Sequence, residues 1–234
     1  MDNKKRKSLR ALHVDRIWPT LSPKGLAFLE LQQDPSFPFV PKEEILPTLA
    51  TAIAFGEEMA QQQPEFTDYR NLLNYLLQAG LKIRFRQQHP TDQQVRAQYI
   101  HQPPTIDIFL NSIQQLQNFF TKTITAVHEE ELISLHLYHE LFHHLEKKAK
   151  KKSKKKITKC TIKQWGPFTI KRRLTSAREI AAHTFTQTMM RLNWSPLLLD
   201  RLIFYTQQGW TNEQIREQFA KVKIELKALE NGEN

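Results

Sequence analysis

The sequence predicts an α+β fold, in which helices pack on a small antiparallel sheet and a helical pair follows at the C-terminal end. Apolar residues recur at helical spacing over long stretches, and Leu81–Arg86 alternates apolar and basic residues as a strand with one buried face does. A chain of 234 residues, of which 40% are hydrophobic, is long and apolar enough to bury a full core.

The first part of the chain divides into an irregular segment and two helices. Residues 1–41 carry prolines at 19, 23, 35, 38 and 41 with little periodicity, so we expect an extended, irregular N-terminal segment. Glu43–Gln63 is predicted to be a helix that Pro64 ends. Thr67–Ala79 is predicted to be a second helix, which Gly80 closes.

Further strands are predicted after Leu81–Arg86. Gln94–Gln102 is a weaker strand and Thr105–Leu110 a stronger one. Thr105–Leu110 is either an exposed sheet edge that pairs with an extended peptide or an ordinary internal strand, and the sequence leaves both open.

The rest of the chain is predicted to be mainly helical. The helices are expected at Ser112–Phe120, Glu129–Lys148, Ser176–Leu192, Ser195–Gly209 and Thr211–Leu229, with short strands at Ile157–Ile162 and Phe168–Lys171. The last helix opens with Thr211 and Gln214, a pair typical of a capping box.

The formal net charge of +10 comes from two local tracts. Residues 4–7 supply four positive charges and the lysines from Lys147 to Lys159 supply nine, so the rest of the chain carries about −3. We expect residues 147–156 to form a mobile lysine-rich surface loop, because such a composition buries too little apolar area to become ordered. The alternative is contact with nucleic acid or with an acidic substrate.

Cysteine usage and the N-terminus bear on location. The single cysteine, Cys160, excludes an intrachain disulfide and favours a reducing compartment. The basic residues at the N-terminus have no apolar stretch behind them, so they do not form a signal peptide. No apolar run is long enough to cross a bilayer. We therefore expect a cytoplasmic protein without a membrane partner.

Residues 139–143 read His-Glu-Leu-Phe-His inside a run that is predicted to be helical. Histidines four residues apart on a helix lie on one face, so His139 and His143 can bind one metal ion, and Glu140 lies near enough to act as a general base. The chain's own residue frequencies give about 0.03 chance matches to this pattern. Because thiolate-rich zinc sites are excluded, the metal must rely on His, Glu or Asp.

A catalytic zinc site normally has three protein ligands, and Glu179 is the best candidate for the third. It begins a predicted helix in which Ala181 and Ala182 allow close approach to a partner. However, Ser176 and Glu179 also fit a capping box, in which Glu179 would only bond the backbone of its own helix. The residues alone leave both roles open.

These motifs resemble those of the ImmA/IrrE family of cytoplasmic zinc metallopeptidases. The resemblance rests on His139-Glu140-Leu-Phe-His143 and on Glu179-Ile-Ala-Ala182-His-Thr-Phe185, and it extends loosely over residues 42–230. It implies a zincin-like minimal metallopeptidase domain over residues 42–193, with Zn²⁺ bound by His139, His143 and Glu179. Residues 194–234 would then be a C-terminal helical extension. Substrates in the family include transcriptional repressors, so a repressor is one expected protein substrate.

A zinc endopeptidase also needs a group that stabilises the tetrahedral oxyanion. His183, Tyr138 and His136 are the candidates, and we take His183 as the catalytic partner of Glu140. The competing function is a regulator that binds DNA or protein through the C-terminal helical pair, with zinc structural or absent. Its second helix carries balanced charges, whereas a helix that faces phosphates should be basic.

Overall fold

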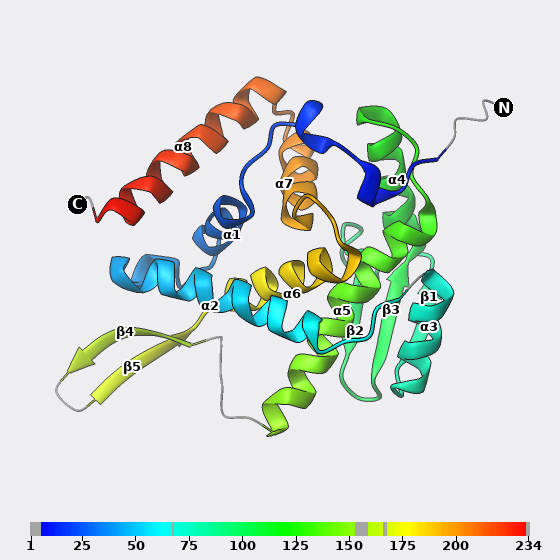
Figure 1. The fold of residues 1–234 in the computed structure, drawn as a ribbon, viewed down its shortest axis with the longest axis horizontal. Coiled ribbons are helices and arrows are strands. Elements are labelled where there is room, and N and C mark those ends of the chain that lie inside the picture. Colours follow the sequence, from blue (N-terminus) through cyan, green and yellow to red (C-terminus); the bar gives the residue numbers. More distant parts are fainter. Residues whose placement is uncertain (1–5, 67, 153–158, 166–167, 233–234) are drawn as a thin grey trace.

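The computed structural model describes residues 6–66, 68–152, 159–165 and 168–232, and it describes the backbone alone at residues 150–152, 159–165 and 168–173. It confirms the α+β class: helices pack against a small sheet at one side of the molecule (Figure 1).

The small sheet is mixed and not antiparallel throughout. It contains β1 (Lys82–Arg86), β2 (Ala97–Ile100) and β3 (Thr105–Phe109) in the order β1-β3-β2. β3 runs antiparallel to β2 but parallel to β1, so the prediction of an antiparallel sheet is wrong for one strand pair. The alternation of apolar residues marks which face is buried but carries no information about strand direction.

The position of β3 settles the choice left open for Thr105–Leu110. β3 is the central strand and all five of its residues are buried, so it is an internal strand. The edge strands are β1 and β2. On β1 the predicted single buried face is incomplete, because Phe85 is 46% exposed.

The prediction of an irregular segment over residues 1–41 is wrong, because α1 (Pro23–Gln32) lies within it. Pro23 occupies the first turn, where a missing N–H costs nothing, and the Ser22 side chain accepts a hydrogen bond from the Gly25 backbone N–H. The residues before α1 also belong to the core: Leu9, Leu12 and Val14 are each at most 3% exposed. Proline count alone therefore misjudged this part of the chain.

The predicted helices of the middle of the chain are confirmed within a few residues. They are α2 (Lys42–Gln61), α3 (Tyr69–Gln78) and α4 (Leu110–Thr123). Gly80, which was expected to close α3, has a φ of 83°, a conformation that side chains rarely adopt.

The motif helix α5 (Glu129–Lys152) extends further than predicted. Residues 147–152 of the expected lysine-rich loop are helical, and residues 153–156 lie outside the described part. Lysine is a good helix former, and positive charges at a C-terminal end interact favourably with the helix dipole. Composition therefore marked the tract correctly as polar but did not exclude a helix.

Helix α6 (Thr175–Met190) runs through the centre of the molecule and crosses α2 closely. At the crossing a Cβ atom on Gly56 would lie 2.4 Å from the Ala181 carbonyl oxygen, so only glycine fits there. Together α2, α5 and α6 enclose a core that includes Phe142, Phe185 and Leu49, each 0% exposed.

The C-terminal helical pair is present as α7 (Pro196–Gln207) and α8 (Asn212–Asn231), and the capping box of Thr211 and Gln214 is confirmed. The pair packs on the rest of the protein: α7 contacts α6 and α1, and α8 contacts α1 and α2.

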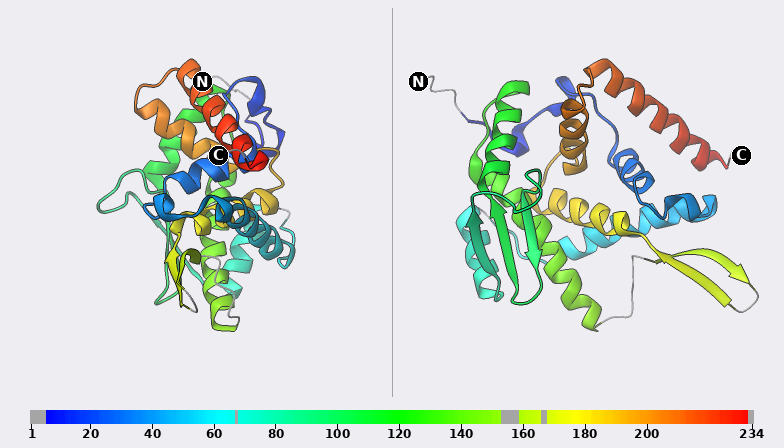
Figure 2. Two further views of the ribbon diagram at one scale, coloured as in Figure 1. Left: turned by 90° about the vertical axis from the view of Figure 1, so that its left-hand side faces the viewer. Right: turned by 180° about the vertical axis from the view of Figure 1, so that it is seen from behind.

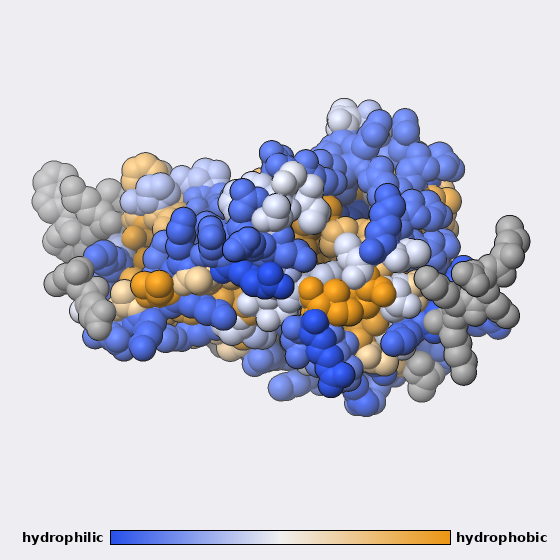
Figure 3. Space-filling view, turned by 90° about the horizontal axis from the view of Figure 1, so that it is seen from above, coloured by the Kyte–Doolittle hydropathy of each residue, from blue (hydrophilic) through white to orange (hydrophobic). Residues whose placement is uncertain are grey.

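A β-hairpin connects the two helices that carry the predicted metal ligands. It consists of β4 (Lys159–Trp165) and β5 (Phe168–Arg173) and projects from the body between the end of α5 and the start of α6 (Figures 1 and 2). Seen from above, the surface is mostly hydrophilic and apolar side chains reach it in patches (Figure 3). Among the described residues, no helix combines the length and the apolar character that crossing a membrane requires.

Candidate metal centre

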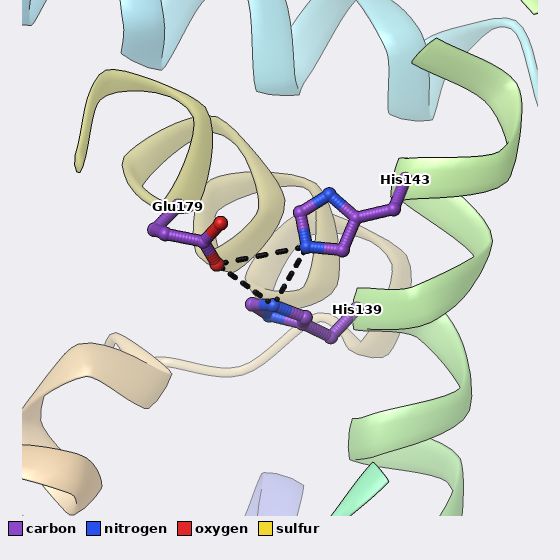
Figure 4. Close-up of side chains that lie close together, drawn as sticks. All are labelled: His139, His143 and Glu179. Atoms are coloured by element: carbon purple, nitrogen blue, oxygen red, sulfur yellow. Dashed lines mark hydrogen bonds and ion pairs between the residues drawn. The ribbon is translucent and has the colours of Figure 1, made fainter. Parts of the chain in front are cut away.

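Three predicted ligand side chains meet between α5 and α6 (Figure 4). His139 Nε2 lies 3.1 Å from His143 Nε2 and 3.2 Å from Glu179 Oε2, and His143 Nε2 lies 3.6 Å from the same carboxylate oxygen. The two histidines come from consecutive turns of α5, as their spacing predicts. All three donor atoms therefore point at one small volume.

The start of α6 is capped by a residue from a distant part of the chain. Asp34 Oδ2 accepts hydrogen bonds from the Ser176 backbone N–H at 2.9 Å, from Ser176 Oγ at 3.0 Å and from Thr175 Oγ1 at 3.1 Å. Burial raises the pKa of the Asp34 carboxyl, but the hydrogen bonds from Ser176 and Ser36 outweigh it and leave the pKa lowered. An ionised carboxylate thus sits at a helix N-terminus, where the helix dipole favours it.

This arrangement rules out the capping-box role of Glu179. Ser176 bonds to Asp34 rather than to the N-terminal amides of α6, and Glu179 reaches the histidines instead. A second contact fixes the two helices: Arg178 Nε donates to Glu146 Oε2 of α5 at 2.6 Å, and the Glu146 side chain is 3% exposed. Glu179 is therefore held against α5 by its immediate neighbour.

Without a metal, burial, hydrogen bonds and nearby charges shift the pKa values of His139 and Glu179. Burial lowers the pKa of His139, but the hydrogen bond to Glu179 and the nearby carboxylates of Glu140, Glu179 and Asp200 raise it to about 9 overall. Burial raises the pKa of Glu179, but the hydrogen bonds from His139 and His143 hold it well below its usual range. The site favours a positive charge next to an ionised carboxylate.

Two of the three proposed ligands, His139 and Glu179, line a pocket of about 240 Å³. Glu140, which is 8% exposed, lines this pocket together with His136 and His183. His183 lies one turn after Glu179 on α6, and its ring centroid is 4.6 Å from that of His139. Tyr138, a third candidate for the oxyanion, does not line the pocket; it packs toward Phe66 on another side of α5.

Two residues of the pocket were missed from the sequence. Asp200 on α7 lies with Oδ2 3.4 Å from His183 Nε2, and its Oδ1 accepts a hydrogen bond from Arg96 Nη1 at 2.9 Å. Burial lowers the pKa of His183 to about 4, and the positive charge of His139 adds to this, whereas Asp200 opposes it. Asp200 directly follows three leucines, and a carboxylate at the end of such an apolar run could have been recognised as a candidate site residue. Nothing in the sequence marked Arg96.

The donor atoms fit a zinc ion. Zinc bonds of about 2.0–2.2 Å in a tetrahedral arrangement place neighbouring donor atoms about 3.3 Å apart. The observed separations of 3.1, 3.2 and 3.6 Å are close to that value. Two imidazoles and one carboxylate also form the ligand set of one class of catalytic zinc sites, in which water or the substrate takes the fourth position.

Comparison of the chain with models of protein families, with curated proteins and with solved structures finds no match.

Proposed function

We propose that the protein is a zinc-dependent endopeptidase that hydrolyses a protein substrate, and that its fold is zincin-like. The main support is the triangle of His139, His143 and Glu179 with donor atoms 3.1–3.6 Å apart. Glu140 adds to it, because a protein that needed zinc only for folding would have no use for a buried carboxylate beside the ligands. The motif resemblance to the ImmA/IrrE family points the same way.

The proposed mechanism assigns the proton transfers to Glu140. A zinc ion held by the three ligands supplies a Lewis acid that polarises the scissile carbonyl and lowers the pKa of water. The Glu140 carboxylate takes the proton from the attacking water and delivers it to the leaving amine. Its place in the pocket, next to His139 in the chain, suits both transfers.

We assign the oxyanion to His183. Asp200 lies 3.4 Å from one ring nitrogen of His183 and is itself bonded to Arg96, so the imidazole has a fixed orientation. In this proposal the Nε2–H of the neutral imidazole donates to the oxyanion. Asp200 thus acts as a positioning residue.

The substrate would approach along β2. This strand pairs with β3 on one side, and its first residue, Ala97, lines the pocket together with residues 94–96, which lead into it. An extended peptide can add to such an edge through backbone hydrogen bonds. A transcriptional repressor is the substrate class that the family resemblance suggests.

The structure offers little support for the alternative function, a DNA- or protein-binding regulator. Helix α8 packs on α1 with Lys24 and Gln32 bonded to its Glu230 and Glu225, and α7 supplies Asp200 to the pocket. Residues of both helices are therefore engaged in contacts within the protein.

The test is hydrolysis of an unfolded protein, such as denatured casein, by the zinc-loaded wild type and by Glu140→Gln. We expect the wild type to cleave and the variant to keep one zinc per chain while losing at least about 100-fold in rate. His139→Ala, as the matched control, should lose both zinc and cleavage. Full cleavage by zinc-loaded Glu140→Gln would contradict the assigned role.

A further inference from the structure

A second pocket of about 320 Å³ adjoins the metal pocket and lies between α4 and α7, which run side by side in Figure 1. Both pockets are lined by Gln94 and Arg96, so they meet at the segment that leads into β2. The remaining lining residues of this second pocket, which we call the α4–α7 groove, come from one face of each helix.

Helix α7 sets the length of the groove. Asp200 lines the metal pocket, whereas Ile203 and Gln207 line the groove, and their spacing of three and seven residues places them on one face of α7. Seven residues of helix span about 10 Å, because each residue rises about 1.5 Å. An extended chain covers the same distance with about three residues.

The lining indicates what chemistry the groove accepts. Its floor is apolar, with Leu116 1% and Ile203 9% exposed. Its rim carries the side-chain amides of Gln94, Gln115, Asn118 and Gln207. Uncharged amides donate and accept hydrogen bonds, as peptide groups require, while an apolar floor accommodates an apolar side chain.

Charge at the groove argues against recognition of a chain end. The described lining residues include no carboxylate that could bind an amino terminus. Arg96 is already bonded to Asp200, and Lys122 is exposed at the rim. The groove therefore suits the interior of a chain.

We propose that the α4–α7 groove binds about three residues of an extended protein segment on one side of the scissile bond, with an apolar side chain placed on Leu116 and Ile203. This inference rests on the proposed peptidase function. It makes the groove a specificity-determining site and implies that a substrate must be unfolded or extended locally to be cleaved.

The test uses binding rather than turnover. Affinity for zinc-loaded protein is measured by calorimetry with acetohydroxamate, which reports on the metal site alone, and with hydroxamates that carry one to four leucine residues. Two series are needed, one with the hydroxamate at the N-terminal end of the peptide and one with it at the C-terminal end. They test the two directions in which a substrate could lie in the groove. We expect one series to gain about tenfold per leucine up to the third residue and then level off.

Neighbouring glutamines provide matched variants. Gln207 lines the groove, whereas Gln208 is the exposed residue that ends α7 and does not line it. Gln207→Trp should remove most of the gain along the series while leaving zinc content and acetohydroxamate affinity unchanged. Gln208→Trp should keep the gain.

The outcomes separate the two proposals. No gain in either series, or a gain that Gln207→Trp leaves intact, overturns the groove while the peptidase proposal stands. Failure of acetohydroxamate to bind the zinc-loaded wild type overturns the peptidase proposal and the groove with it.

Discussion

The sequence allows Glu179 to be either a metal ligand or a capping-box residue, and Asp34 decides between the two roles. A serine three positions earlier makes it fit a capping box, but Asp34 takes over that serine and leaves the carboxylate free to reach His139. Asp34 lies 142 positions before Ser176 in the sequence, so no local pattern around Glu179 predicts the hydrogen bond between them.

This difference gives a prediction at Glu179. Glu179→Gln should lower zinc affinity steeply, by at least about tenfold, because it replaces a charged ligand with a neutral amide. Ser176→Ala should retain zinc and lower the unfolding free energy by about 1 kcal/mol, because it removes one hydrogen bond to Asp34. Both are measured by zinc titration against a chelating dye and by urea unfolding. Equal zinc affinities in Glu179→Gln and the wild type would leave the site without its third ligand.

His144 gives a prediction for pH. It is 3% exposed, with Nδ1 2.9 Å from the Tyr99 hydroxyl, and burial together with the charge of Lys148 lowers its pKa to about 4. The unfolded chain, with an ordinary histidine pKa of about 6.5, takes up the proton first, so the folded state loses stability as pH falls from 6.5 toward 4. The loss should be about 1–2 kcal/mol between pH 7 and pH 5.

The measurement is urea unfolding of the metal-free protein at both pH values. His144→Gln cannot titrate and should lack this part of the pH dependence, although its overall stability is lower. A pH dependence identical to that of the wild type would show that other groups cause it.

At the scale of elements, the crossing of α2 and α6 determines where Glu179 lies. The close approach depends on Gly56, because the Ala181 carbonyl and the Thr184 side chain pack where a side chain at this position would lie. The sequence marked Ala181 and Ala182 as residues that permit close approach, and this is confirmed, but it did not identify Gly56 as the partner.

Gly56→Ala should therefore destabilise the protein by about 1–3 kcal/mol, because a backbone carbonyl 2.4 Å from the new Cβ forces the helices apart. The sign of this change in stability is informative, because replacing glycine by alanine at an open helix position stabilises a protein by about 0.5–1 kcal/mol. Ala54→Gly at an exposed site of the same helix measures that propensity alone. Stabilisation by Gly56→Ala in thermal unfolding would mean that the helices are not in close contact.

At the scale of the whole molecule, the candidate metal site joins two helices that the β4–β5 hairpin separates in sequence. His143 and Glu179 are 36 positions apart, and the chain between them includes the hairpin. A ligand that binds only the folded state stabilises it by mass action, by about 4 kcal/mol at a thousandfold excess over Kd.

Zinc should accordingly raise Tm by about 10 °C, because about 1 kcal/mol shifts Tm by roughly 2–4 °C in a chain of this size. Differential scanning calorimetry with and without zinc measures this. His139→Ala should show little shift, and a shift as large as that of the wild type would place the zinc elsewhere.

The sequence predicted the parts of this molecule that depend on local spacing. The histidine pair on α5, the N-terminal cap of α8 and the end of α3 at Gly80 all follow from residues within one or two turns. It did not predict α1, the direction of β1 relative to β3, or Asp200 and Arg96 in the pocket. The start of α1 does carry a local signal, Ser22 followed by Pro23, which the count of prolines obscured. The other features depend on contacts between segments far apart in the chain, which periodicity does not encode.

The cap that Asp34 places on α6 has a consequence for how the protein is made. The ribosome synthesises the chain from its N-terminal end, so Asp34 emerges long before the helix that it caps. The two histidines of α5 likewise emerge before Glu179 and Asp200. A nascent chain therefore presents an incomplete set of the proposed metal ligands until α6 has been synthesised. Any hydrolytic activity would be withheld from the chain until Glu179 and Asp200 have both emerged.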